Sequence, residues 1–211
     1  MKRLVWCALL AGLAAPAAAQ LRGIELRAGA LAALSKRNAA FDSAVGTGSG
    51  TMSGMDVTVR TKWFGAEVRV LGGEFTADSP GTAAGTIANG DIRLMAGPRS
   101  VAAEVGYGRR GFSGAISTIT WSFIRIGVRA SLPLGGSGLH AGVVLGLYSG
   151  VSGAGVTGKG NGKEAETSLT YAPERLPLYL TLGYRREQFT FAAAPEELSG
   201  IVVGGGIRLG R

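Results

Sequence analysis

The segment Gly153–Gly160 contains the glycine spacing of two phosphate-binding motifs, GxGxxG and most of GxxxxGK. In such motifs, backbone N–H groups hold the phosphates and a lysine, here Lys159, binds the terminal ones. However, Gly160 replaces the serine or threonine that would bind magnesium, and Asn161-Gly162 is a poor start for a helix. No strand–helix–strand pattern surrounds the segment, so we interpret it as a flexible, glycine-rich extracellular loop without a nucleotide.

His140 is the only histidine of the chain. A histidine that activates a nucleophile needs a serine and an acidic residue beside it. Ser131 and Ser137 are close in sequence, but no pattern places them at the imidazole. An enzyme acting on lipid or peptide is an alternative, and a histidine that is hydrogen-bonded to its neighbours is the interpretation we favour. We expect no catalytic residue, no cofactor and no metal site.

The first residues have the pattern of a secretion signal. Lys2 and Arg3 form a positive start, Leu4–Leu13 an apolar middle, and Ala17–Ala19 supplies small residues before a cut ahead of Gln20. We therefore divide the chain into a signal peptide, 1–19, and one domain, 20–211. Cys7 is the only cysteine and lies in the signal, so the mature chain is expected to have no disulfide.

The chain has a formal net charge of +8, which falls to +6 once the two basic residues of the signal are removed. A basic excess can indicate a nucleic-acid partner when the charges cluster. Here they stand singly between apolar residues, which favours internal pairing or contact with anionic lipid. We therefore expect no nucleic-acid partner.

Alternation of apolar and charged residues recurs along the whole chain, as in Ile24–Arg27, Asp56–Arg60, Glu67–Val70 and Asp91–Leu94. Successive side chains of a β-strand point to opposite faces, so each segment has one apolar and one charged face. No later stretch is long enough for an apolar membrane helix, so a membrane-spanning chain must form a closed barrel. The pattern predicts an all-β fold, a closed antiparallel up-and-down transmembrane β-barrel.

We predict ten strands, with eight as the alternative because the eighth strand has the weakest pattern. Long polar connections, among them Leu34–Met52, Thr76–Gly85 and Gly150–Lys163, alternate with tight turns such as Gly97–Ser100. The predicted strands are Arg22–Ala33, Ser53–Trp63, Gly65–Phe75, Thr86–Ala96, Val101–Arg109, Ile116–Leu132, Leu139–Ser149, Glu164–Tyr171, Leu176–Phe191 and Gly200–Leu209.

Alternation alone does not say which face points outward, since a soluble periplasmic ligand-binding barrel would place its apolar face inside. Three observations favour an apolar exterior. The loop lengths alternate as in outer-membrane barrels, acidic and basic residues pair along strands, and aromatic residues lie near predicted strand ends, where the membrane interface would be. These aromatic residues are Trp63, Phe64, Phe75, Tyr107, Trp121, Tyr148, Tyr171, Tyr184 and Phe191.

An apolar exterior places the charged residues in the lumen. Buried charges without partners are costly, so we expect them to pair and to leave a largely plugged interior, with a narrow porin for small solutes as the alternative. The expected lumen network consists of Glu25, Arg27, Asp56, Arg60, Lys62, Glu67, Arg69, Asp91, Arg93, Glu104, Arg125, Arg129, Glu166, Arg185, Glu187 and Arg208.

The sixth predicted strand departs from regular alternation. Ile124, Ile126 and Val128 share one face opposite Arg125, whereas the preceding apolar residues Ile119, Trp121 and Phe123 have the other parity. We predict a β-bulge near Ser122–Ile124 that returns the apolar face to lipid, and a continuous ladder with Trp121 inside would contradict it.

Over Arg22–Leu209 the chain resembles the small outer-membrane β-barrels of Gram-negative bacteria, the OmpA/OmpX-like and opacity-type group. The resemblance rests on the strand pattern. It implies localisation in the outer membrane after signal cleavage, insertion by the barrel-assembly machinery, contact with outer-membrane lipid, and a structural or interaction role in the cell envelope. One departure is the C-terminus, Ile207–Arg211, which lacks the terminal aromatic residue common in this group.

Overall fold

The computed structural model describes residues 23–39, 47–78, 85–114, 118–136, 138–154, 159–191 and 194–210. The predicted signal peptide, its cut before Gln20 and Cys7 lie outside the described residues. No helix in the described ranges has the length and apolar character needed to span a bilayer.

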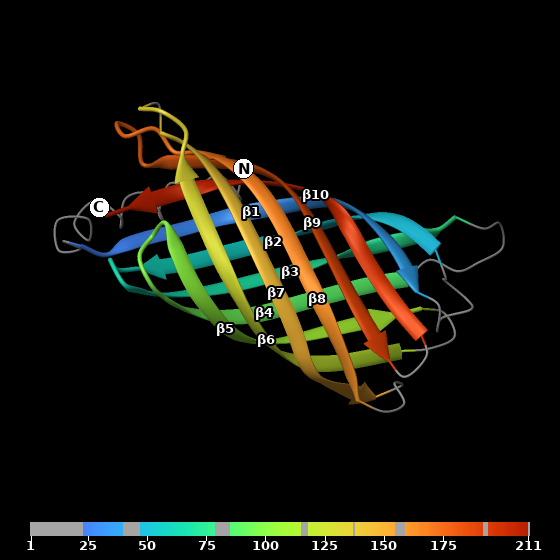
Figure 1. Cartoon of the computed structure of the whole chain (residues 1–211). Coiled ribbons are helices and arrows are strands. Elements are labelled where there is room, and N and C mark those ends of the chain that lie inside the picture. Colours follow the sequence, from blue (N-terminus) through green and yellow to red (C-terminus); the bar gives the residue numbers. More distant parts are fainter. Residues whose placement is uncertain are drawn as a thin grey trace.

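The chain forms one closed barrel of ten antiparallel strands, in which each strand pairs with its sequence neighbours and β1 pairs with β10 (Figure 1). The predicted fold class and strand number are therefore confirmed, and the eight-strand alternative is wrong. The strands are β1 (Glu25–Ala39), β2 (Thr47–Arg60), β3 (Phe64–Ala77), β4 (Gly85–Ala96), β5 (Val101–Ser113), β6 (Thr118–Pro133), β7 (Leu139–Ala154), β8 (Gly160–Tyr171), β9 (Leu178–Phe191) and β10 (Ala194–Leu209).

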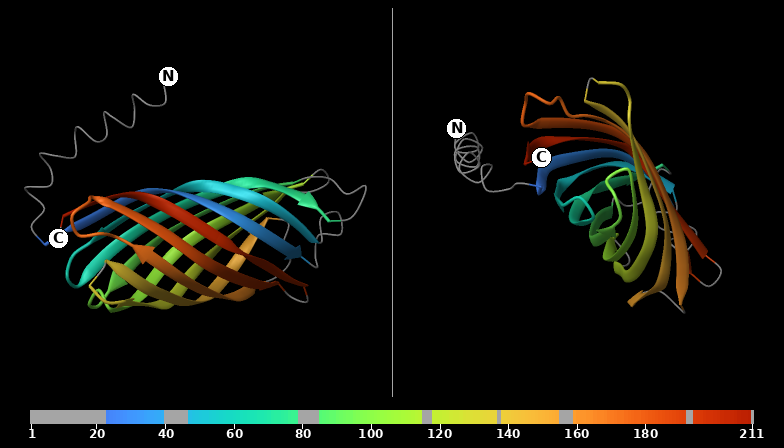
Figure 2. Two further views of the ribbon diagram at one scale, coloured as in Figure 1. Left: turned by 90° about the horizontal axis from the view of Figure 1, so that it is seen from above. Right: turned by 60° about the vertical axis from the view of Figure 1, so that its left-hand side comes forward.

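The pairing registers are staggered around the barrel. Following paired residues from Leu26 on β1 through the other nine strands returns to β1 at Asn38, twelve residues further along. A closed barrel needs such a stagger, and it inclines the strands to the barrel axis, as Figure 2 shows. Both ends of the barrel sequence meet at one rim, where Leu26 pairs with Leu209.

At the rim away from the chain ends, which we call the far end, the strands continue into segments predicted as long loops. Ser35 pairs with Gly50 and Asn38 with Thr47, inside the expected loop Leu34–Met52. The connection between these strands is 40–46, and those after β3 and β7 are 78–84 and 155–159. The predicted alternation of loop lengths holds for the first four connections, 40–46, 61–63, 78–84 and 97–100. It is wrong for the later ones, where 172–177 at the other rim is longer than 155–159 and 192–193. A ladder satisfies backbone groups whatever the side chains are, so it extends through polar residues beyond the apolar zone.

The opposite rim, which we call the turn end, is made by short connections. After β2, the Thr61 hydroxyl accepts hydrogen bonds from the backbone N–H groups of Trp63 and Phe64, at 3.4 and 2.9 Å. After β4, Gly97 has a φ of 129°, a left-handed conformation that favours glycine. Its N–H donates to the Trp63 carbonyl at 2.8 Å, which joins the two turns.

The predicted β-bulge near Ser122–Ile124 is wrong in its strand and in its consequence. The register between β6 and β7 does shift between Ser122 and Ile124, but the extra residue belongs to β7, where Gly150 has a φ of 62°. The pairing of β6 with β5 is continuous, and Trp121 is fully buried inside the barrel. Alternation on β6 is thus unbroken, and the lumen itself becomes apolar at this level.

Candidate functional site

The wall of the barrel separates an apolar exterior from a mainly charged interior. On β3, the side chains of Val68 and Val70 are exposed, while that of Glu67, which points to the other face of the strand, is only 2% exposed. On β4, Ile92 and Leu94 face outward and Arg93 is fully buried. The apolar face therefore points out, as expected, and the arrangement of a soluble ligand-binding barrel is wrong.

A network of ion pairs fills the middle of the lumen, a region we call the charged level. Arg125, on β6, donates to Glu104 of β5 and, at 2.5 Å, to Glu164 of β8. Arg129 donates to Glu104 at 2.5 Å and to Glu67 at 2.7 Å. These contacts run from β6 to its neighbour β5 and also to β3 and β8, so two of them join strands that are not adjacent in the barrel.

The network continues on the other side of the lumen. Arg69 donates to Glu166 at 2.9 Å, and Arg185 lies 3.1 Å from Glu164 and 2.9 Å from Glu187. A buried guanidinium is tolerated when carboxylates meet it at such distances. The glutamates of this network each meet at least one arginine, whereas Asp56 of β2 is partly buried and accepts a hydrogen bond from the Tyr179 hydroxyl at 3.4 Å.

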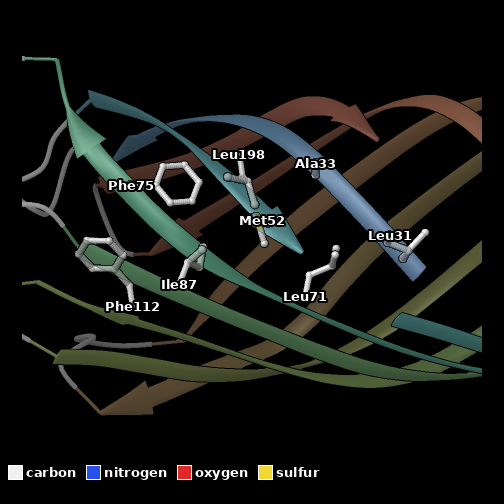
Figure 3. Close-up of a cluster of buried hydrophobic side chains, with 8 residues drawn as sticks. All are labelled: Leu31, Ala33, Met52, Leu71, Phe75, Ile87, Phe112 and Leu198. Carbon is white, nitrogen blue, oxygen red and sulfur yellow. The ribbon is translucent and has the colours of Figure 1, made fainter. Parts of the chain in front are cut away.

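Two apolar clusters occupy the lumen towards the far end, a region we call the apolar level. The first joins side chains of β1–β5 and β10, which point towards one another in Figure 3. It consists of Leu31, Ala33, Met52, Leu71, Phe75, Ile87, Phe112 and Leu198. The second belongs to β6, β7 and β9 and consists of Ile119, Trp121, Phe123, Tyr148, Val151, Phe189 and Phe191.

Ring contacts order the second cluster. Phe189 stacks on Tyr148 with ring centroids 4.6 Å apart, and Trp121 meets Phe191 edge to face at 5.5 Å. The Tyr148 hydroxyl lies 3.0 Å from a Glu164 oxygen and 2.6 Å from a Glu187 oxygen. Tyr148 therefore joins the apolar level to the charged level.

A chain of buried ion pairs passes along the two apolar clusters. Arg37 donates to Glu196 at 2.8 Å, and its guanidinium lies 3.8 Å from the centre of the Phe112 ring in the first cluster. Arg110 donates to Glu187 at 2.5 Å and lies 4.8 Å from the Phe189 ring in the second cluster. The arginines thus combine carboxylate and aromatic partners, which stabilise a guanidinium in a poorly hydrated site.

Polar contacts gather at the turn end of the lumen, where the side chains of Arg27 and Arg99 remain 33% and 42% exposed. Arg60 donates to the carbonyls of Gly97 and Pro98 at 3.3 and 3.0 Å, in the turn after β4. Glu25 accepts hydrogen bonds from Arg27 at 2.5 Å and from Arg99 at 2.9 Å. These bonds tie the ends of β1 and β2 to the neighbouring turn.

The structure places the predicted lumen residues as follows. All but Lys62 lie on strands with the parity of the charged face; Asp56, Arg27, Arg69, Arg129, Glu166 and Arg208 are partly buried and the others are buried. The prediction that Lys62 lies in the lumen is wrong, because β2 ends at Arg60 and the turn that starts at Thr61 leaves the lysine exposed.

Sequence reasoning missed four buried charges: Arg37, Arg110, Glu164 and Glu196. Three lie in segments predicted as loops, and Glu164 opens the predicted eighth strand. The sequence did contain a pattern that points to them. Arg37 is an even number of residues from Arg27, and Glu164 from Glu166, so each pair shares one face of a strand. Extending the alternation past the apolar zone would have found them.

The predicted aromatic belt is partly wrong. Trp63, Phe64, Tyr107, Tyr171 and Tyr184 are exposed on the exterior or in turns. The remaining four are buried inside the barrel, where they fill the apolar level, since they carry the parity of the lumen: Phe75, Trp121, Tyr148 and Phe191.

The two sequence features that suggested chemistry stay apart from the charged level. Gly153 lies next to the last residue of β7, and Gly160 is the first residue of β8. Residues 155–158 between them lie outside the described residues, and no helix follows the motif, because β8 is a strand. His140 is partly buried near the turn end, where it pairs with Pro133 and Thr170. In the described ranges, no three or more histidine, cysteine and acidic residues are arranged to hold a metal ion.

Little space is left where the charged and apolar levels meet. A gap of ≈ 20 Å³ lies there, lined among others by Leu71, Asn89 and Glu187. Such a volume holds about one water molecule. At this junction the side chains therefore leave room for little more than one water molecule.

No protein-family profile and no curated protein sequence matches the chain. Solved structures that it resembles include the translocator domain of the autotransporter NalP from Neisseria meningitidis, with 11% identity, a TM-score of 0.42 and coverage of 96% of each chain. OpdK of Pseudomonas aeruginosa with vanillate has 11% identity, a TM-score of 0.31 and coverage of 87% of this chain and 98% of that one. The TodX monoaromatic hydrocarbon channel has 9% identity, a TM-score of 0.30 and coverage of 89% and 90%. At these TM-scores the likenesses carry no weight for function, and membership of the OmpA/OmpX-like or opacity-type group stays a prediction.

Proposed function

We propose that this chain is an outer-membrane β-barrel with a closed lumen, which serves a structural or interaction role in the cell envelope and catalyses no reaction. The observation that carries the proposal is the filled interior, where ion pairs occupy the charged level and apolar side chains occupy the level above. The apolar exterior supports the membrane location, and the filled interior supports the absence of a pore.

The exterior supports a location in lipid. Each of the ten strands exposes at least one large apolar side chain on the exterior, as Leu34 does on β1 and Val203 on β10. A soluble monomer rarely exposes a contiguous apolar surface of this extent, because water disfavours it. A closed barrel also leaves no unpaired strand edge in lipid.

The interior supports a closed lumen over a narrow porin. A conducting pore needs a continuous aqueous path, whereas here arginines bond to carboxylates on facing strands and the rings of Trp121 and Phe189 lie above them. The charged groups at the apolar level, Arg37 with Glu196 and Arg110 with Glu187, are already paired, so an ion crossing it would lose its hydration for little gain, which is costly.

The proposal also includes the route to the membrane. The predicted signal implies secretion and cleavage before Gln20, and the resemblance implies insertion by the barrel-assembly machinery. The far-end connections 40–46, 78–84 and 155–159 would then face the outside of the cell as interaction segments with an unassigned partner. Mass spectrometry of the purified mature chain tests the cleavage site directly.

Two measurements test the function. After expression with its own leader, the chain should fractionate with outer membranes and require detergent for release; recovery in the soluble periplasm would contradict the membrane location. The purified barrel, inserted into planar bilayers, should give no stable conductance steps. Reproducible steps from inserted monomers would contradict the closed lumen and favour the narrow porin.

A further inference from the structure

We propose that the outer wall over β6–β9 holds one phosphate-bearing lipid, with an acyl chain in a groove and the phosphate on Lys163 and Arg186. The inference rests on the proposed membrane location and extends it to a specific site. The groove has a volume of ≈ 630 Å³ and lies on the exterior of the barrel.

The two sides of the groove differ in chemistry. One side is apolar and comes from the outward side chains of β6 and β7, with Ile126, Val128, Leu145 and Leu147. The other side is polar and comes from β8 and β9. Lys163 of β8 pairs with Gln188 of β9, and Arg186 is the next outward residue of β9. An apolar wall beside cationic groups complements a lipid that carries an acyl chain and an anionic headgroup.

A small residue makes room for the chain. Ala165 stands between these two walls, where it pairs with Leu145 of β7 and Arg186 of β9. Its outward neighbours along β8 are Lys163 on one side and Thr167 on the other, since alternate residues share a face. A larger side chain at Ala165 would fill the groove, whereas one at Thr167 lies outside its lining.

The cationic side lies at the edge of the apolar exterior. On β9, Arg186 is the first outward residue beyond Leu182 and Tyr184, which are exposed and apolar. The Arg186 guanidinium donates to Glu197 at 2.8 Å, and its side chain remains 58% exposed. Because a guanidinium has five N–H donors, the pair with Glu197 orients Arg186 and leaves donors for a phosphate.

Lys163 supplies the second charge. Its side chain is exposed, and within the described ranges no ion pair involves it. With Arg186 and Glu197, the site carries one net positive charge, which suits a phosphate at the boundary between the apolar exterior and water.

The test uses the full mature chain and its variants, each first shown to insert into phosphatidylcholine vesicles. Native mass spectrometry then measures the binding of phosphatidic acid, of diacylglycerol and of inorganic phosphate to the detergent-solubilised barrel. We expect phosphatidic acid to bind more tightly than either of the other two, because only it has both the chain and the phosphate.

Paired variants separate this site from general surface effects. Lys163→Gln should weaken phosphatidic acid binding about fivefold, since one basic residue near a membrane surface contributes about that much. Ala165→Phe should weaken it by a similar factor. The controls Arg109→Gln, an exposed basic residue on β5, and Thr167→Phe should leave it within about twofold.

The outcomes distinguish the two proposals. Equal losses in Lys163→Gln and Arg109→Gln, or equal binding of phosphatidic acid and diacylglycerol, would overturn the lipid site while the barrel still inserts. A wild-type chain that does not insert into vesicles would instead contradict the membrane location itself.

Discussion

The charged level and the apolar level of the lumen close the same barrel by different interactions. At the charged level, Arg125 and the arginines near it bridge separate strands through hydrogen bonds of about 2.5–2.9 Å to carboxylates. At the apolar level, rings and aliphatic side chains exclude water, and the two arginines among them, Arg37 and Arg110, each combine a carboxylate with an aromatic ring. The comparison teaches that a barrel interior need not be uniformly polar when the lumen is filled instead of open.

The two levels also differ in what a substitution should cost. Removing one member of a buried ion network leaves charges without partners in a poorly hydrated space. Removing part of an apolar side chain leaves a cavity and loses contacts. The predictions below test this difference, each with a matched control, by chemical unfolding of the folded barrel in detergent micelles.

Arg125→Ala should have the largest effect. It leaves Glu104 and Glu164 without their shared guanidinium, and we expect the free energy of unfolding to fall by about 3–5 kcal/mol. Arg175→Ala, in an exposed turn, is the control and should change it by less than about 0.5 kcal/mol. A loss no greater than that of the control would mean that the charged level does not stabilise the barrel.

Tyr148→Phe tests the contact between the two levels. The substitution keeps the ring stacked on Phe189 but removes the hydroxyl shared with Glu164 and Glu187. We expect a loss of about 1.5–3 kcal/mol, which is usual for a buried hydrogen bond to a charged group. In the control, Tyr184→Phe on the exposed exterior, the unfolding free energy should stay nearly constant. A gain in stability for Tyr148→Phe would show that the two levels are independent.

Ile87→Val should have the smallest effect and probes the apolar level alone. Ile87 is 2% exposed in the first cluster, so losing one methyl group should cost about 0.5–1.5 kcal/mol. Ile92→Val lies on the same strand but faces outward, and it should cost less than half as much. If both variants lose the same amount, the apolar level is not packed more tightly than the outer surface.

Much of the fold followed from alternation, while the site followed only in part. The parity of Glu67, Arg69 and Arg93 placed them inside, because side-chain direction in a strand is a local property. Glu196 and Arg110 were missed, since glycine-rich and polar segments were interpreted as loops although the ladder runs through them. The β6 aromatics were assigned to lipid, because an apolar residue was assumed to belong outside.

The sequence by itself determined the ten alternating strands and the two chemically distinct faces, since both depend on residues close together in the chain. The sequence favoured an apolar exterior without deciding it, because alternation is the same whichever face points outward. Only the tertiary structure, with Ile92 exposed and Arg93 buried, decided it. It also decided which charges meet: Arg125 reaches Glu164 across 39 positions and Arg37 reaches Glu196 across 159. Those pairings depend on the stagger with which the barrel closes, which no single strand encodes.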